Sequence, residues 1–95
     1  MRFTSELWRY SGEDGWHFVT LPAEITDEIR ARGAGLHRPF GSLPVQARLS
    51  EVTWRTSLFA DKKRNAYLLP VKAEVRRQAD VSVGDVVDVQ IDLLT

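Results

Sequence analysis

The sequence predicts a small, mainly β protein in which about six strands close into a barrel, with one α-helix after the first two strands. Its 95 residues are the size of one domain, and we expect that domain to span residues 1–95. Runs of β-branched, aromatic and large aliphatic residues recur along the chain, separated by short clusters of turn-forming residues. Closure into a barrel would pair the strand edges that a small open sheet leaves exposed.

The beginning of the chain predicts a β-hairpin followed by the helix. Residues 2–10 and 16–21 have strand-like composition, and a cluster of Ser, Gly and acidic residues lies between them. Pro22 suits the first turn of a helix, because its φ is already fixed and it has no N–H to leave unpaired. Residues 23–32 place acidic side chains first and basic ones last, which complements the helix dipole. Gly33 is a natural end for this helix.

The middle of the chain predicts a loop and then three strands. Residues 35–44 are rich in Gly and Pro, which is typical of a loop. The strands are expected at residues 45–50, 53–59 and 66–71. Pro70 cannot donate to a strand ladder, so the end of the third strand is expected to be an edge or a bulge.

The end of the chain predicts a short helix and the final strand. Residues 73–79 are expected to form the helix, with Arg76 and Arg77 facing outward, and Gly84 and Asp85 predict a turn. The last strand alternates apolar and polar residues, the apolar ones being Val87, Val89, Ile91 and Leu93.

Composition excludes several classes of function. The chain has no cysteine, which excludes disulfides, thiolate zinc sites and a thiol nucleophile. Its apolar runs are far shorter than the ~18 residues that span a bilayer. The N-terminus carries charge throughout and lacks the apolar core of a signal peptide. We therefore expect a cytoplasmic protein with no membrane segment.

Charge is balanced overall but unevenly distributed along the chain. The formal net charge is zero, yet residues 30–77 hold eleven basic and three acidic side chains. Residues 1–29 hold two basic and six acidic side chains, and residues 78–95 hold four acidic and no basic ones. Two interpretations stay open: acidic strands lie beside basic ones and neutralise them, or the middle of the chain forms a basic face.

Four short motifs follow one another along the chain. They are Trp16-x-Phe18-Val19-x-Leu21-Pro22, Trp54-Arg55-Thr56-Ser57-Leu58-Phe59, Tyr67-Leu68-Leu69-Pro70-Val71-Lys72 and Val83-Gly84-Asp85-x-Val87-x-Val89. In this order, from about Phe3 to Leu93, the chain resembles the family catalogued as domain of unknown function 1905. The resemblance implies a double-split β-barrel, an architecture shared with the swapped-hairpin DNA-binding domains of bacterial transition-state regulators and antitoxins. Those relatives bind DNA as intertwined dimers, whereas one chain is expected to fill the barrel here. The family has no established activity, so the resemblance implies a fold and leaves the function open.

Catalytic and metal-binding patterns are weak in this sequence. Ser57, His17 and Asp85 can be combined into a triad on paper, but no nucleophile-elbow spacing accompanies them. The two His residues are isolated, without the spacing of a zinc site. We expect His17 to be a hydrogen-bonded structural residue and His37 to be a solvated loop residue. The sequence thus predicts no catalytic residue, no metal and no cofactor, and an enzyme is kept as a third hypothesis.

The best candidate site is basic. Arg55 and Ser57 share one face of a predicted strand, opposite Trp54, and Lys72 and Arg76 follow the next strand. Guanidinium, ammonium and hydroxyl groups together can form charge-assisted hydrogen bonds to a carboxylate or phosphate. We therefore predict a non-enzymatic binding module, a monomer or homodimer, for a small anion or an acidic protein partner. The alternative is that Arg55 and Lys72 pair with acidic side chains of neighbouring strands.

A second hypothesis is sequence-tolerant nucleic-acid binding. Lys62, Lys63 and Arg64 form a basic hairpin tip, and Arg76 and Arg77 add two further cations. So few phosphate contacts would need a dimer to double the patch. The three Trp residues are expected in the core or at the barrel mouth, with a stacking platform as the alternative; they are Trp8, Trp16 and Trp54.

Overall fold

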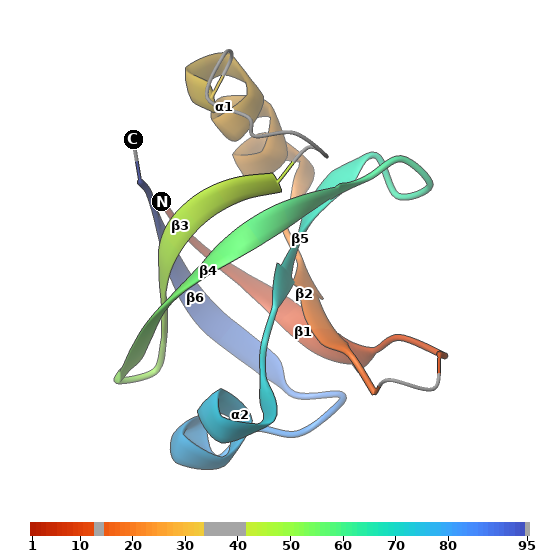
Figure 1. The fold of residues 1–95 in the computed structure, drawn as a ribbon, viewed down its shortest axis with the longest axis vertical. Coiled ribbons are helices and arrows are strands. Elements are labelled where there is room, and N and C mark those ends of the chain that lie inside the picture. Colours follow the sequence, from red (N-terminus) through yellow and green to blue (C-terminus); the bar gives the residue numbers. More distant parts are fainter. Residues whose placement is uncertain (13–14, 34–41, 95) are drawn as a thin grey trace.

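Six antiparallel strands close into a barrel in the computed structural model, which describes residues 1–12, 15–33 and 42–94 (Figure 1). The strands are β1 (Arg2–Arg9), β2 (His17–Thr20), β3 (Ser42–Leu49), β4 (Val52–Asp61), β5 (Ala66–Pro70) and β6 (Val86–Leu93). Their order around the barrel is β1-β2-β5-β4-β3-β6. The helices are α1 (Ala23–Gly33), which follows β2, and α2 (Ala73–Ala79), which follows β5. The predicted mainly β barrel with two helices is confirmed.

The N-terminal hairpin has the predicted arrangement. In the β1–β2 pair, Leu7 lies opposite Val19, and both side chains are fully buried inside the barrel. The neighbouring pair, Trp8 opposite Phe18, points to the outer face because successive side chains of a strand alternate. This parity places two aromatic rings on the outside of the barrel.

The two helices lie at opposite ends of the barrel (Figure 1). Ile29 is the fully buried residue of α1, and Thr26 is buried beside it. The Thr26 hydroxyl donates to the Leu21 carbonyl (3.4 Å) and accepts from the Tyr67 N–H (3.5 Å), which ties α1 to β5. Within the described ranges, neither helix has the length and apolar character to span a bilayer.

Strand β3 begins earlier than the predicted loop allows. The loop was expected to extend to Pro44, but β3 starts at Ser42, and Pro44 lies opposite Ser57 of β4. The Pro44 carbonyl accepts from the Leu94 N–H (3.1 Å), just past the end of β6. The nitrogen of Pro44 lies on the same side of β3 as its carbonyl, at the point where the pairing of β3 with β6 ends. The missing N–H therefore interrupts no hydrogen bond within that ladder. The remainder of the predicted loop and His37 lie outside the described residues.

Strands β4 and β5 pair over a short stretch and then separate. Three residue pairs join them, from Phe59 opposite Leu68 to Asp61 opposite Ala66, although β4 begins as early as Val52. The other end of β5 stays paired with β2, where Pro70 lies opposite Phe18. At Pro70, the edge of β5 that faces β4 is therefore unpaired, as the sequence predicted. The separation of these two strands positions the site described below.

The barrel interior is filled by the inward-facing residues of all six strands. Val75 of α2 is also buried, so this short helix covers one end of the barrel. Large side chains with no more than 1% exposure form the centre of the core; they include Leu7, Leu21, Leu43, Leu49, Leu58, Leu69 and Ile91. The alternation predicted for the last strand is confirmed, because Val87, Val89 and Ile91 are buried.

The turn before β6 is held against β1. Gly84 has a φ of +95°, a conformation that L side chains rarely adopt. The Gly84 N–H donates to the Leu7 carbonyl, and the Leu7 N–H donates to the Asp85 carbonyl, both at 2.9 Å. The Asp85 carboxylate also accepts from the Ser82 N–H (2.8 Å). The predicted turn is therefore present and fixes the entry into β6.

Candidate functional site

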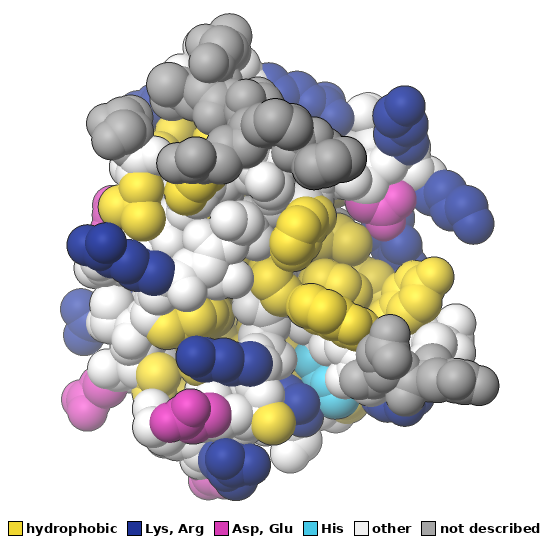
Figure 2. All heavy atoms as spheres, viewed as in Figure 1, with side chains coloured by type: hydrophobic (Ala, Val, Ile, Leu, Met, Phe, Trp, Pro, Cys, Tyr) yellow, Lys and Arg dark blue, Asp and Glu magenta, His cyan; other side chains and the backbone are white. Residues whose placement is uncertain are grey.

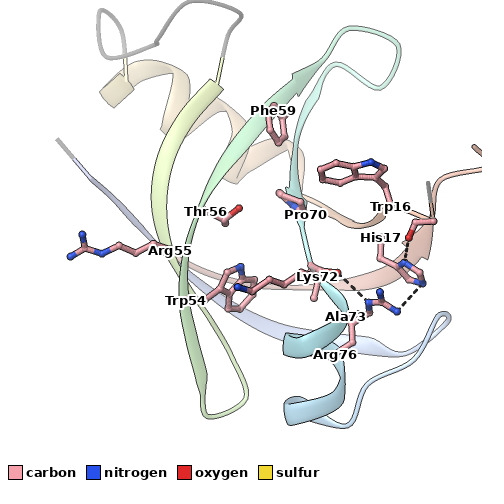
Figure 3. Close-up of a pocket in the computed structure, with 12 residues that line it drawn as sticks. Trp16, His17, Trp54, Arg55, Thr56, Phe59, Pro70, Lys72, Ala73 and Arg76 are labelled. Carbon is pink, nitrogen blue, oxygen red and sulfur yellow. Dashed lines mark hydrogen bonds between the residues drawn. The ribbon is translucent and has the colours of Figure 1, made fainter. Parts of the chain in front are cut away.

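A cavity of about 410 Å³ opens where β4 and β5 separate. Three parts of the chain line it: the end of the β1–β2 loop, the outer part of β4 and the junction of β5 with α2. Figure 3 shows Trp16, Phe59 and Pro70 on one side of this cavity, with Lys72 and Arg76 below them. The walls are mostly apolar, and the polar groups that reach the cavity are mostly basic.

Arg76 is anchored in this cavity by two hydrogen bonds. Its Nε donates to the Val71 carbonyl (3.2 Å), and one terminal nitrogen donates to His17 Nε2 (3.3 Å). An arginine can only donate, so His17 Nε2 is the acceptor and Nδ1 carries the proton. His17 Nδ1 then donates to the Gly15 carbonyl (2.7 Å). His17 is hydrogen-bonded at both nitrogens, as expected, and the partners of these nitrogens are Gly15 and Arg76 and not Ser57.

The prediction that Arg76 and Arg77 both face outward is wrong for Arg76. Arg77 is exposed, whereas Arg76 is half-buried against His17. The helix has seven residues and successive positions lie about 100° apart around it, so the two neighbours point in different directions. One of them turns toward the barrel and the other toward solvent.

Lys72 approaches the same cavity from another direction. It is the N-cap residue of α2, and its side chain extends toward Trp54 (Figure 3). Among the described residues, neither Lys72 nor Arg76 forms an ion pair with a carboxylate. The two cations therefore flank one apolar cavity without an internal counter-ion in the described part of the chain.

Arg55 and Ser57 do not join this pair. Trp54 is buried and faces the cavity, so Arg55, one position later on β4, points to the opposite side. Figure 3 shows its guanidinium directed away from the cavity, although part of the residue lines the wall. Ser57 shares the face of Arg55 and does not line the cavity. The four residues predicted for the anion site therefore do not converge. Lys72 and Arg76 line the cavity, whereas Arg55 and Ser57 lie on the other face of β4. The alternative pairing of Arg55 with an acid is not seen among the described ion pairs.

A second, wider depression of about 890 Å³ adjoins the first. The two share Trp16 and Phe59 in their walls, so one surface runs continuously from α2 toward the β4–β5 turn. Figure 2 shows hydrophobic side chains gathered on this side of the molecule, next to basic side chains at that turn. We call this surface the aromatic face; its rings belong to Trp8, Tyr10, Trp16, Phe18 and Phe59.

The rings of the aromatic face are arranged in series. The Trp16 and Phe18 rings are stacked, with centroids 5.9 Å apart and an angle of 9° between their planes. Phe18 also contacts Trp8, at 5.3 Å and 41°. The Arg64 guanidinium lies 4.2 Å from the centroid of the Trp8 ring, within the range of a cation–π contact. The series therefore begins at Arg64 and ends at Trp16.

Arg64 is held over Trp8 by an acidic neighbour. It pairs with the Asp61 carboxylate at 2.6 Å, and Asp61 also accepts from the Lys63 N–H (3.0 Å). The Arg64 side chain is the main cause that lowers the pKa of Asp61 below its ordinary value. Lys62 and Lys63 are exposed at the same turn, and neither forms an ion pair within the described ranges.

Three aromatic side chains of this face are unusually exposed. Trp16 is 48% exposed, Tyr10 51% and Phe59 41%. Of the three tryptophans expected in the core or at the mouth, Trp54 is buried and Trp8 half-buried, whereas Trp16 lies on the outer surface. Sequence reasoning anticipated part of this face through the alternative of a stacking platform at the Trp residues, but it did not include Phe18 and Phe59, which it treated as ordinary strand residues. The alternation of side chains along a strand could have revealed Phe59. Because Leu58 is buried, its neighbour Phe59 is expected to point outward.

The five basic residues of the nucleic-acid hypothesis do not form one patch. Lys62, Lys63 and Arg64 lie at the β4–β5 turn, and Arg76 and Arg77 lie on α2, at the other end of the barrel (Figure 1). Within the described ranges, no three His, Asp or Glu side chains gather closely enough to hold a metal ion. The aromatic face instead connects the basic turn with Arg76, and Arg77 lies outside it.

Fold and site together define a small closed β-barrel that carries an aromatic and cationic face on its outer surface. The chain belongs to the family described as Domain of unknown function (DUF1905), whose model matches residues 3–91. The resemblance drawn from the four sequence motifs is thereby confirmed. A comparison with functionally curated proteins gave no match.

Proposed function

We propose that this protein is a non-enzymatic binding module that holds an anionic group at Arg76, with Lys72 as a second cation on the same cavity. The observation that carries the proposal is the anchoring of Arg76. Its guanidinium is held at two positions, by the Val71 carbonyl and His17, without a carboxylate among the described residues. A preorganised cation loses little conformational entropy when it binds an anion.

The donors left on the two cations suit an oxyanion. A guanidinium has five N–H donors, and two of those on Arg76 are used, so three remain for a ligand. Lys72 adds three more donors on a flexible stem. The apolar wall formed by Trp54 and Phe59 lowers the local dielectric constant, which strengthens charge-assisted hydrogen bonds. An anion with two charged groups, or an acidic protein segment, could reach both cations.

Another basic depression on the barrel is a weaker candidate. It measures about 250 Å³ and contains Arg2 and Arg48. Arg2 already pairs with Asp88 at 3.2 Å, and the Arg48 Nε donates to the Ser50 carbonyl (3.0 Å). The Asp88 carboxylate at this place would repel an incoming anion. We therefore assign the anion site to Arg76 and not to this depression.

Calorimetric titration with inorganic pyrophosphate at low salt tests the proposal. We expect binding to wild type, and an affinity about tenfold or more lower for Arg76→Gln, because a hydrogen bond to a charged group contributes about 1.5–3 kcal/mol. Arg77→Gln is the matched control, since Arg77 is the exposed neighbour on the same helix and should bind like wild type. A tetraglutamate peptide, titrated in the same way, tests the acidic protein segment.

Either ligand supports the proposal if its binding depends on Arg76 and not on Arg77. A non-enzymatic module also leaves pyrophosphate unhydrolysed, which phosphorus NMR would show after prolonged incubation. The proposal is wrong if neither anion binds at low salt, or if Arg76→Gln and Arg77→Gln weaken binding equally.

A further inference from the structure

We infer that the aromatic face binds single-stranded nucleic acid, with a base stacked on Trp16 and a neighbouring phosphate held by Arg76. This inference rests on the proposed function, because it names the class of ligand whose anionic group occupies that site. It is carried by the series of ring contacts, by its open end beside the cation site and by the cations at both ends of the face.

The ring series leaves one position open for another ring. Phe18 stacks on Trp16 at 5.9 Å with nearly parallel planes, so one face of the indole is already covered. Trp16 is nonetheless 48% exposed, and the ring contacts found within the described ranges lie on its Phe18 side. At the far end, Arg64 covers Trp8. A planar base would therefore extend the series at Trp16, the ring that reaches the cavity of Arg76 (Figure 3).

Cations line both cavities of the face, which suits a ligand with several phosphates. Arg76 and Lys72 line the first cavity, and Lys62 and Lys63 line the second, with Trp16 and Phe59 shared between them. Among the described residues that line either cavity, Asp61 is the acidic one, and it is neutralised by Arg64. Single-strand-binding proteins combine these same features, a basic path for the backbone and aromatic side chains for the bases.

Other occupants fit these observations less well. A duplex keeps its bases stacked inside, so their faces cannot reach Trp16. A second copy of the chain would bring the same cations against one another, because a two-fold interface joins the same surface of both subunits. A free mononucleotide would stack its base on Trp16 and place its phosphate at Arg76. It would leave Lys62 and Lys63 without a phosphate to bind.

Fluorescence anisotropy with a labelled dT oligonucleotide of about 12 nucleotides tests the inference, since single-strand-binding domains occupy roughly 4–16 nucleotides. We expect binding at low salt, with log K falling against log salt at a slope of about −2 to −3 if three or four phosphates are contacted. Trp16→Ala should weaken binding about tenfold or more, whereas Trp16→Phe, which keeps a stacking ring, should retain most of it. Val86→Ala is the control, because Val86 is 70% exposed and does not line the aromatic face.

Lys63 and Arg76 separate this inference from the proposed function. Lys63→Gln should weaken oligonucleotide binding and leave pyrophosphate binding close to that of wild type, because Lys63 lines the second cavity and not the cavity of Arg76. If pyrophosphate binds through Arg76 but the dT oligonucleotide does not bind, the inference is wrong and the proposed function stands. If pyrophosphate, tetraglutamate and the dT oligonucleotide all fail to bind, both are wrong.

Three further outcomes contradict the inference specifically. The first is a duplex of the same length that binds as tightly as the single strand. The second is a mononucleotide whose affinity equals that of the oligonucleotide, which would assign the site to a small ligand. The third is a dimer in sedimentation that Trp16→Ala converts to monomer, with no oligonucleotide binding, which would make the aromatic face a self-association surface. The unfolding midpoint of each variant is measured alongside, to check that the variant folds.

Discussion

Replacing Leu69 with alanine is expected to lower the free energy of unfolding by about 3 kcal/mol. Leu69 is fully buried in β5 and lies opposite Val19 of β2, inside the barrel. The substitution removes buried methyl and methylene groups and leaves a cavity that the surrounding strands cannot fill by relaxation. In a domain of this size the expected drop in the thermal midpoint is about 10–25 °C.

Urea unfolding followed by circular dichroism measures this effect. The midpoint should fall while the slope m stays the same, because the surface exposed on unfolding is nearly unchanged. Val86→Ala is the control and should change stability by no more than about 0.5 kcal/mol, since its side chain is mostly exposed. A loss below about 1 kcal/mol for Leu69→Ala would mean that the barrel interior is not packed as described.

A second large effect is expected at the turn before β6. Gly84→Val should cost about 2 kcal/mol, because a β-branched residue is strained at a φ of +95°. No heavy atom lies within 4 Å of the position where a Cβ would stand among the described residues, so the cost comes from the backbone and not from a clash. The same unfolding measurement checks it. Strain at this turn would also loosen the two hydrogen bonds between the turn and Leu7.

The opposite substitution at a nearby position provides the control. Asp80 caps α2 in a left-handed conformation with a φ of +55°. Asp80→Gly should be neutral or slightly stabilising, because glycine adopts that conformation without a steric cost. If Gly84→Val proves as neutral as Asp80→Gly, positive φ at Gly84 is not required by this fold.

Much of the fold could be predicted because its signals are local. The alternation in residues 87–93 and the composition of residues 73–79 each arise within a few neighbouring residues, and both elements formed as expected. The start of β3 was missed because Pro44 reads as a loop residue. Its tolerance in the strand depends on where β6 ends, which the local sequence does not contain.

The candidate site could be predicted only in part, because it depends on contacts between distant strands. Lys72 and Arg76 were identified from charge and spacing, but the inward direction of Arg76 follows from its bond to His17, which is 59 positions away in the chain. The cavity opens where β4 separates from β5. Where these strands separate depends on which of their residues pair, and the composition of the strands does not determine that. The aromatic face was anticipated only as the alternative of a stacking platform at the Trp residues, because the outward direction of Phe18 and Phe59 depends on how their strands pair.

The central claim of this account is that an anion binds at Arg76, between α2 and the end of the β1–β2 loop. Titration of the ¹⁵N-labelled protein with inorganic pyrophosphate, followed by two-dimensional NMR, tests it most directly. We predict that the largest amide shifts fall at residues 15–17 and 71–76, the segments that line the cavity. Shifts confined to the region of Arg2 and Arg48, or no shifts at all, would contradict the claim.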